Sequence, residues 1–349
     1  MSFLPFLRKK GVGIDIGNFS IKIVELKESR EGKILENFGL IPASAILKGG
    51  GFRTFERDTV LISADEVEKA LKILSKESGI KLEKVCFSLP DFVSFFSSFE
   101  IPKLKKEEIP LVVKTEARKY LPIGISEVDF TWKIVSSFDV SYKVILIAFP
   151  KEVTHQYKLI AQNLKIKEFT FEPEMISLSR VFGEEGAVAI VDFGAKSICC
   201  SIVEDKNLKF NFSIDFGGNL LNDKISKNFG IRLEDAEELK KEYGIKDPEN
   251  PLTKVLLPYF QKVWQDCEKI FDEFQRREKK DIKKIILCGG GAVMPGLLEF
   301  FQKHSKIEVT IGNPFLKILT PHHFLDKIEI EDAVLFSVAI GSALKIFEK

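Results

Sequence analysis

Short apolar runs alternate with polar turns along most of this 349-residue chain, and two stretches share one pattern. In the first, an apolar strand ends in Asp15-Ile-Gly17, a short polar turn follows, and a second apolar strand begins. In the second, a strand ends in Asp192-Phe-Gly194 and another strand again follows the turn. Because the two stretches lie about half a chain apart, we expect two related halves, each opening with a β-hairpin.

Each half continues with strands and helices in the order typical of α/β domains. In the first half, a strand over 34–42 precedes a helix that begins after Ser63 and repeats apolar residues at helical spacing. In the second half, a strand over 208–216 ends at Gly217-Gly218 and helical patterns follow to about 280. The stretch from about 84 to 158 reads differently, with four strand-like runs and one helix over 105–120. It predicts a subdomain inserted into the first half.

Composition excludes several classes of protein. The chain has 52 Lys and Arg against 51 Asp and Glu, so no general nucleic-acid partner is expected. Its five cysteines include no CxxC pair, which indicates buried free thiols rather than disulfides or a zinc site. No apolar run approaches the roughly 20 residues that span a bilayer. We therefore expect a cytoplasmic protein without a transmembrane segment.

The two hairpin turns offer chemistry for binding phosphate. Backbone N–H groups converge at a glycine-containing turn, and such concavities bind anions. The first cradle is expected to comprise Gly17, Asn18, Phe19, Ser20 and Lys22, and the second Gly194, Ala195, Lys196 and Ser197. Asp15 and Asp192 at the strand ends could hold a hydrated Mg²⁺. One such hairpin is a weak signal, but two with matching surroundings favour a nucleotide site.

A third glycine motif follows a predicted strand over 284–288. Gly289, Gly290 and Gly291 would let the backbone pass close beneath a flat ligand such as a purine. The motif lacks the Gly-Lys-Ser/Thr of a Walker A loop and the spacing of a dinucleotide fold.

These motifs, in this order, resemble those of the actin, heat-shock chaperone and sugar-kinase ATPase superfamily. The resemblance implies ATP between the hairpins, with Glu237 and Lys240 beside adenine and ribose. Gly217, Gly218 and Met294 complete the implied nucleotide-binding set. Glu172 matches a superfamily Glu-Pro position whose carboxylate can orient an attacking water. Read from the residues alone, it is equally an acid at a helix N-terminus beside a proline.

The segment over 116–130 is similar to the PilM family of type IV pilus assembly proteins, itself related to FtsA. The implied fold is α/β and actin-like (ribonuclease H-like), with two related domains around a nucleotide cleft and an FtsA/PilM-type insertion. Domain I would span 1–185 with its insertion at about 85–157. Domain II would span 186–349 with an inserted subdomain at about 218–283 and a C-terminal helix, 333–349, that returns toward domain I.

The family implies an ATP-binding adaptor at the inner face of the cytoplasmic membrane. It would bind the N-terminal tail of a PilN-like inner-membrane protein beside the insertion and link it to the pilus motor ATPases. Phe19 stands where the family usually has a small residue, so we expect slow or no hydrolysis. Two alternatives stay open: an FtsA-like filament protein, and a small-molecule kinase of the same fold. Such a kinase would need a catalytic carboxylate base, for which Asp91 or Asp192 could be nominated.

Overall fold

Two five-stranded sheets with the same strand order form the centre of the protein. A computed structural model describes residues 9–56, 59–325 and 328–348. The first sheet has the order β3-β2-β1-β6-β10 and the second β13-β12-β11-β14-β15. In each, three antiparallel strands are followed by two that join in parallel. The internal repeat expected from the sequence is therefore a repeat of the fold.

The strands of the first sheet are β1 (Lys10–Ile16), β2 (Ser20–Glu28), β3 (Lys33–Pro42), β6 (Lys84–Leu89) and β10 (Glu168–Pro173). Those of the second are β11 (Ala187–Phe193), β12 (Ile198–Glu204), β13 (Asn207–Ile214), β14 (Ile282–Cys288) and β15 (Glu308–Ile311). Most of β11 and all of β12 are buried, because helices cover both faces of the second sheet. All five cysteines are free and buried, as the sequence indicated.

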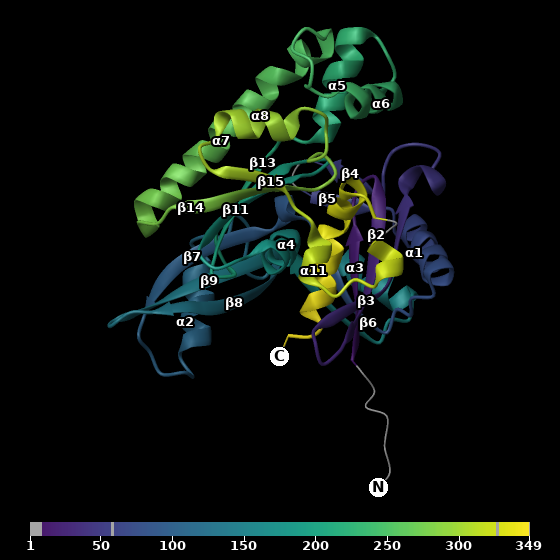
Figure 1. The fold of residues 1–349 in the computed structure, drawn as a ribbon. Coiled ribbons are helices and arrows are strands. Elements are labelled where there is room, and N and C mark those ends of the chain that lie inside the picture. The colour runs from purple at the N-terminus through teal and green to yellow at the C-terminus, as the bar shows by residue number, and fades with distance from the viewer. Residues whose placement is uncertain (1–8, 57–58, 326–327, 349) are drawn as a thin grey trace.

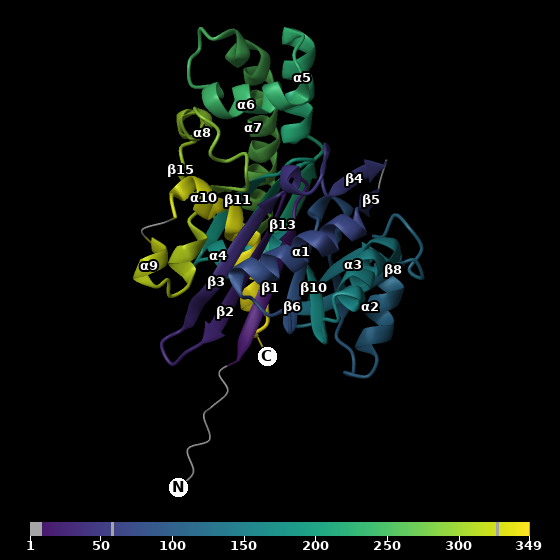
Figure 2. The same ribbon diagram turned by 90° about the vertical axis from the view of Figure 1, so that its right-hand side faces the viewer.

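Amphipathic helices cover the outer faces of both sheets. On the first sheet, α1 (Ala64–Ser78) buries Val67, Leu71 and Leu74, and α3 (Lys151–Asn163) packs beside it. Over the second sheet lie α7 (Pro251–Glu278) and α8 (Leu297–His304), with α5 (Gly218–Phe229) and α6 (Leu233–Tyr243) beyond them (Figures 1 and 2). The long helix α7 begins at Pro251 because the side chain of Asn250 accepts a hydrogen bond from the Leu252 N–H, 2.9 Å away.

Two helices cross between the halves, so that each packs on the sheet of the other half. Helix α4 (Glu174–Phe182) follows the last strand of the first sheet and packs on the second. Helix α11 (Ser337–Lys345) follows the second sheet and packs on β1, β2 and β6 of the first. The two lie side by side in the middle of the molecule (Figure 1). Gly13 on β1 admits this close approach, because a Cβ there would lie 1.9 Å from the carbonyl oxygen of Ala339.

A separate three-stranded sheet, in the order β7-β9-β8, projects from the first half (Figure 1). It comprises β7 (Phe95–Pro102), β8 (Val128–Ser137) and β9 (Ser141–Pro150), and buries its own small core against α2 (Ile109–Ala117). The insertion was expected over about 85–157, but residues 84–89 form a central strand of the first sheet and 151–163 form α3 on its face. Their apolar side chains belong to the main core, so only residues between these two elements form the projection.

Shorter elements complete the described chain. A small hairpin, β4 (Arg53–Glu56) with β5 (Thr59–Ile62), lies against α3. The others are η1 (Ala43–Ala45), η2 (Asp91–Val93), η3 (Pro314–Lys317), α9 (His322–Leu325), α10 (Ile330–Ala333) and η4 (Val334–Phe336).

Candidate nucleotide-binding site

The two predicted hairpins close with the same hydrogen bond. The Gly17 N–H donates to the Ser20 carbonyl at 3.0 Å, and the Gly194 N–H donates to the Ser197 carbonyl at 3.1 Å. Asp15 and Asp192 each precede the glycine by two residues at the end of the central strand of their sheet. The structure thus builds two equivalent turns from the two halves, with one aspartate beside each.

Four carboxylates gather at these turns: Asp15 and Asp192, expected from the hairpins, together with Asp91 and Glu174. Burial first, and then the negative charges of Glu174 and Asp15, together raise the pKa of Asp192 to about 7. Burial and the charge of Glu174 likewise raise the pKa of Asp91 well above its ordinary value. Lys22 lies 3.2 Å from Asp15, and Arg53 lies 3.3 Å from Glu174. Two cations face four acids, so full ionisation of the four carboxyls would leave uncompensated negative charge, which a bound cation would offset.

Several polar atoms here are buried without a hydrogen-bond partner in the described structure. They are Oδ1 of Asn18 in the first turn, Oδ1 of Asn219 beside the second, Oδ2 of Asp91 and Nε of Arg53. Buried polar atoms in folded proteins are nearly always paired, by protein groups, water or ligand. The three oxygen acceptors could accept hydrogen bonds from the water shell of a cation, and the Arg53 Nε–H could donate to a polar ligand.

Direct ligation of a metal ion is a separate question. Among residues 9–56, 59–325 and 328–348, no three His, Cys, Asp or Glu side chains converge as a ligand set. A cation at Asp15 and Asp192 would therefore be held through water, which is how Mg²⁺ commonly binds.

The second turn is covered by the start of α5. The N–H groups of Gly218 and Asn219 donate to the carbonyls of Gly194 (3.0 Å) and Ala195 (2.8 Å). A Cβ on Gly217 would lie 2.5 Å from the carbonyl oxygen of Ala195, so only glycine fits there. Lys196 turns to the surface, where it pairs with the exposed Asp215 at 2.7 Å.

The predicted adenine-side residues form one connected group. Lys240 bonds to the side chains of Glu237 and Asn222, and its Nζ lies 3.5 Å from the Gly218 carbonyl. Burial lowers the pKa of Lys240 even though Glu237 counteracts it. These side chains therefore lie beside Gly218, which is itself hydrogen-bonded to the second turn.

The triple-glycine loop lies against Asp192. Gly289 has a φ of +79°, and a Cβ there would meet the Asp192 carboxylate at 2.1 Å. The Gly291 N–H donates to the Phe193 carbonyl at 3.0 Å, and Met294 is buried further along the loop. Gly290 is less confined, since its Cβ would meet only Leu335, at 3.5 Å. The loop predicted to bind the base thus begins in contact with Asp192, the aspartate of the second turn.

Glu172 does not join this group, which differs from the expectation. Arg180 donates to both of its carboxylate oxygens, at 2.6 and 2.9 Å, and the Ser177 hydroxyl donates to one of them. Its strand β10 is separated from β1 by β6, a distance of about 10 Å across the sheet. The acid that reaches the site is Glu174, two residues later at the start of α4. Only its proximity to the Glu-Pro pair could have signalled it.

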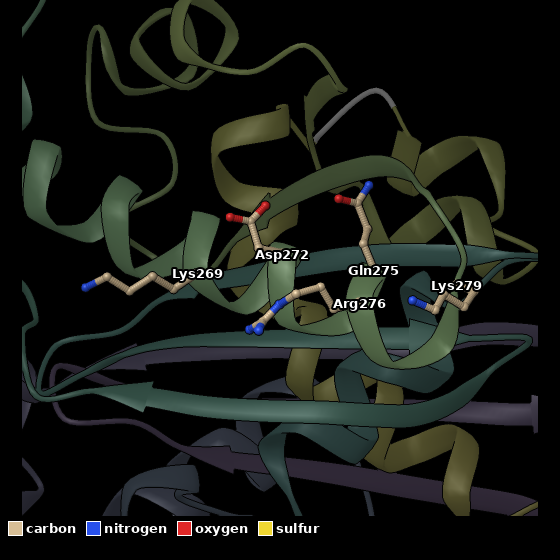
Figure 3. Close-up of a pocket in the computed structure, with 5 residues that line it drawn as sticks. All are labelled: Lys269, Asp272, Gln275, Arg276 and Lys279. Atoms are coloured by element: carbon tan, nitrogen blue, oxygen red, sulfur yellow. The ribbon is translucent and has the colours of Figure 1, made fainter.

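Two surface hollows lie away from these residues. One of about 480 Å³ lies along the C-terminal part of α7 (Figure 3) and is lined by Lys269, Asp272, Gln275, Arg276 and Lys279. The other, about 660 Å³, lies between β5, α3 and the projecting sheet, with Leu61, Asp129 and His155 among its lining residues. Within the described ranges no helix has the length and apolarity required to cross a membrane.

Paired sheets with exchanged helices and one equivalent hairpin turn from each half define the class: an actin-like ATPase fold with an inserted subdomain. The sequence model of the family described as "Type IV pilus assembly protein PilM" matches residues 13–347. The chain belongs to this family, as its motifs indicated.

Similar proteins agree with this assignment. The cell division protein FtsA of Enterococcus faecalis is 21% identical over 371 residues, covering 89% of this chain and 79% of its own. A solved PilM–PilN type IV pilus biogenesis complex matches with a TM-score of 0.81 at 18% identity, covering 97% of this chain and 99% of the other. MreB5 of Spiroplasma citri bound to AMPPNP matches with a TM-score of 0.53 at 14% identity, covering 97% and 96%.

Proposed function

We propose that the chain binds ATP between its two turns, with a hydrated Mg²⁺ held by Asp15 and Asp192. The observation that carries the proposal is the pair of equivalent turns, each beside an aspartate from a different half, of which Asp15 is buried and Asp192 partly buried. The backbone of the turns would receive the phosphates, and Glu237, Lys240 and the loop at 289–291 would flank the base. When bound, Mg²⁺ would offset the negative charge of the phosphates. A fold neighbour solved with AMPPNP supports a ligand of this type.

Hydrolysis is proposed to be slow or absent. Glu174, the acid that α4 contributes to the site, accepts from Arg53 through one oxygen and from the Asp91 N–H through the other. An oxygen already engaged by protein donors is less available to orient an attacking water. Phe19 in the first turn is 44% exposed and adds bulk beside the phosphate position. The site is therefore better suited to holding nucleotide than to turning it over.

We further propose that the chain is an adaptor of type IV pilus assembly. Membership of the PilM family and the match to a PilM–PilN complex support a PilN-like membrane protein as the partner. Its N-terminal tail would bind in the hollow of about 660 Å³ beside the projecting sheet. The protein would then act at the inner face of the cytoplasmic membrane, through this partner, and contact the pilus motor ATPases.

Binding of a fluorescent ATP analogue, with and without Mg²⁺, followed by a phosphate-release assay on the same sample, tests the nucleotide proposal. We expect Mg²⁺-dependent binding with little release. Rapid release would reject the holding role in favour of an active ATPase or kinase, and no binding at all would reject the site.

A further inference from the structure

Glu174 is tied to two elements that flank the projecting sheet. One of its oxygens accepts a hydrogen bond from the N–H of Asp91, at 3.3 Å. Asp91 in turn accepts from the N–H of Met175, at 3.0 Å. Asp91 lies in the short segment that leads from the first sheet into β7, the first strand of the projecting sheet. The entry to this subdomain is thus hydrogen-bonded to an acid of the nucleotide site.

The other oxygen of Glu174 leads to the element that follows the projecting sheet. It accepts from Arg53 Nη1 at 3.3 Å and from Nη2 at 3.4 Å, and Nη2 also donates to the hydroxyl of Tyr157 at 3.2 Å. Arg53 and Tyr157 are buried, and Tyr157 is fully so. Burial opposes the charge on Arg53, but the interactions with Tyr157, Glu174 and Asp15 outweigh it and raise the pKa of Arg53. The guanidinium is therefore a fixed charge that connects Glu174 to α3.

Helix α3 links Tyr157, which Arg53 contacts, to the hollow of about 660 Å³. Gln156, the neighbour of Tyr157, accepts from the Ile62 N–H at 2.7 Å and donates to the Val60 carbonyl at 2.9 Å. Gln156, His155 and Leu61 all line the hollow. The hairpin β4–β5 thus bears Arg53 on one strand and Leu61 on the other. A molecule bound in the hollow would therefore contact the β4–β5 hairpin, which carries Arg53, and α3, which carries Tyr157.

We infer that Arg53 is a positioning residue that, with Tyr157, couples the nucleotide site to the hollow beside the projecting sheet. Nucleotide between the turns changes the surroundings of Glu174, and Arg53 transmits the change to α3 and β5, which line the hollow. Occupation of the hollow changes nucleotide affinity by the same factor, because coupling between binding sites is reciprocal. This inference rests on the proposed nucleotide site and on the proposed occupant of the hollow, the N-terminal tail of a PilN-like protein. It adds the regulation of the nucleotide site by that tail.

An engineered label in the hollow tests the coupling directly. Leu61→Cys introduces a reactive thiol at a position that is 36% exposed, whereas all five native cysteines are buried. An environment-sensitive maleimide fluorophore at this site both occupies and reports on the hollow. The same fluorophore at Leu316→Cys, which is 85% exposed on η3, is the control. Binding of Mg-AMPPNP is measured by calorimetry on labelled and unlabelled chains, so that binding and reporting are independent.

We expect Mg-AMPPNP to change the emission at Leu61→Cys and not at Leu316→Cys. The label at Leu61→Cys should shift the nucleotide Kd about fivefold or more, the lower end of common allosteric coupling. Tyr157→Phe, which removes one hydroxyl and keeps the ring, should reduce both effects, and Arg53→Lys should reduce them further. Tyr120→Phe, at an exposed tyrosine of the projecting subdomain, should leave both unchanged.

The outcomes separate the inference from the proposed function. Nucleotide that binds without changing either the emission or the Kd of the Leu61→Cys chain would overturn the coupling while leaving the site intact. Full effects retained in Tyr157→Phe and Arg53→Lys would overturn the role of Arg53. Absence of nucleotide binding in the unlabelled chain would reject the proposed site, and the coupling with it.

Discussion

Gly341 of α11 lies directly on Ser177 of α4, so closely that a Cβ on Gly341 would come 2.2 Å from the Ser177 carbonyl oxygen. The Ser177 hydroxyl also lies 2.8 Å from that of Ser342, in a fully buried pair. This crossing joins a helix from each half at the point where each packs on the other half's sheet. The glycine is required by backbone approach rather than by conformation, since it lies inside a helix.

The sign of one substitution tests this crossing. Gly341→Ala should stabilise an isolated helix by up to about 1 kcal/mol, because alanine is the better helix former. We expect destabilisation instead, by roughly 1–3 kcal/mol as for other overpacked sites. Thermal unfolding measures it, with Gly290→Ala as the control, since a Cβ there meets only an ordinary contact at 3.5 Å. A rise in Tm for Gly341→Ala would contradict the packing described.

Removal of either turn aspartate should weaken Mg-nucleotide binding. Asp15→Asn and Asp192→Asn keep the side-chain shape but lose the charge that would hold hydrated Mg²⁺. We expect affinity to fall roughly 10–100-fold, the usual effect of losing an outer-shell partner of a metal. Titration with a fluorescent ATP analogue measures it. Asp215→Asn is the matched control, because Asp215 is exposed beside the second turn and pairs there with Lys196. Wild-type affinity in both turn variants would remove the Mg²⁺ assignment.

Much of the fold was predictable because its signals are local. Strand periodicity and Asp-x-Gly turns located both hairpins, and the structure shows their equivalence in the hydrogen bonds of Gly17 and Gly194. The site was less predictable because Arg53, Asp91 and Glu174 come from three separate segments. Nothing in the pattern around Arg53 distinguishes a buried guanidinium from a surface one. Only the tertiary arrangement brings it to Glu174.

The same limit explains the extent of the projecting sheet. Residues 84–89 have the strand character of the insertion that follows them, so the sequence grouped them together. Pairing of β6 with β1 and β10 is a long-range event that no local pattern encodes.

Stability of the nucleotide-free protein should fall as the pH rises toward neutrality. Burial first, and the charges of Glu174 and Asp15 second, raise the folded pKa of Asp192 to about 7 from an ordinary 3.8. Between these values the folded state holds a proton that the unfolded state has lost. This contribution to stability is therefore complete below pH 4 and is lost as the pH rises through 7, by at most about 1.4 kcal/mol per pH unit.

Asp192→Asn should flatten this dependence and raise the Tm of the protein at pH 8. Melting curves from pH 5 to pH 8 in EDTA, without nucleotide, measure the effect for wild type, Asp192→Asn and Asp215→Asn. Asp215 is exposed, so its substitution should leave the slope unchanged. If Asp192→Asn shows the wild-type slope, the buried proton does not reside on this carboxyl.

Substitutions of the two acids near the start of α4, Glu172 and Glu174, should have different effects, because the two side chains contact different partners. Glu172→Gln removes the charge that Arg180 binds through two contacts, and breaking a buried ion pair can lower the free energy of unfolding by about 3–5 kcal/mol. The loss should lie below that range, because Glu348 and the Gly341 carbonyl still bind Arg180. Nucleotide affinity and phosphate release should stay at wild-type values, since Glu172 lies two strands from Asp15.

Glu174→Gln should instead alter nucleotide affinity or release, because Glu174 lies with Asp15 and Asp192. Urea unfolding and phosphate release on both variants distinguish the two. Loss of nucleotide function in Glu172→Gln alone would return the functional role to the Glu-Pro position.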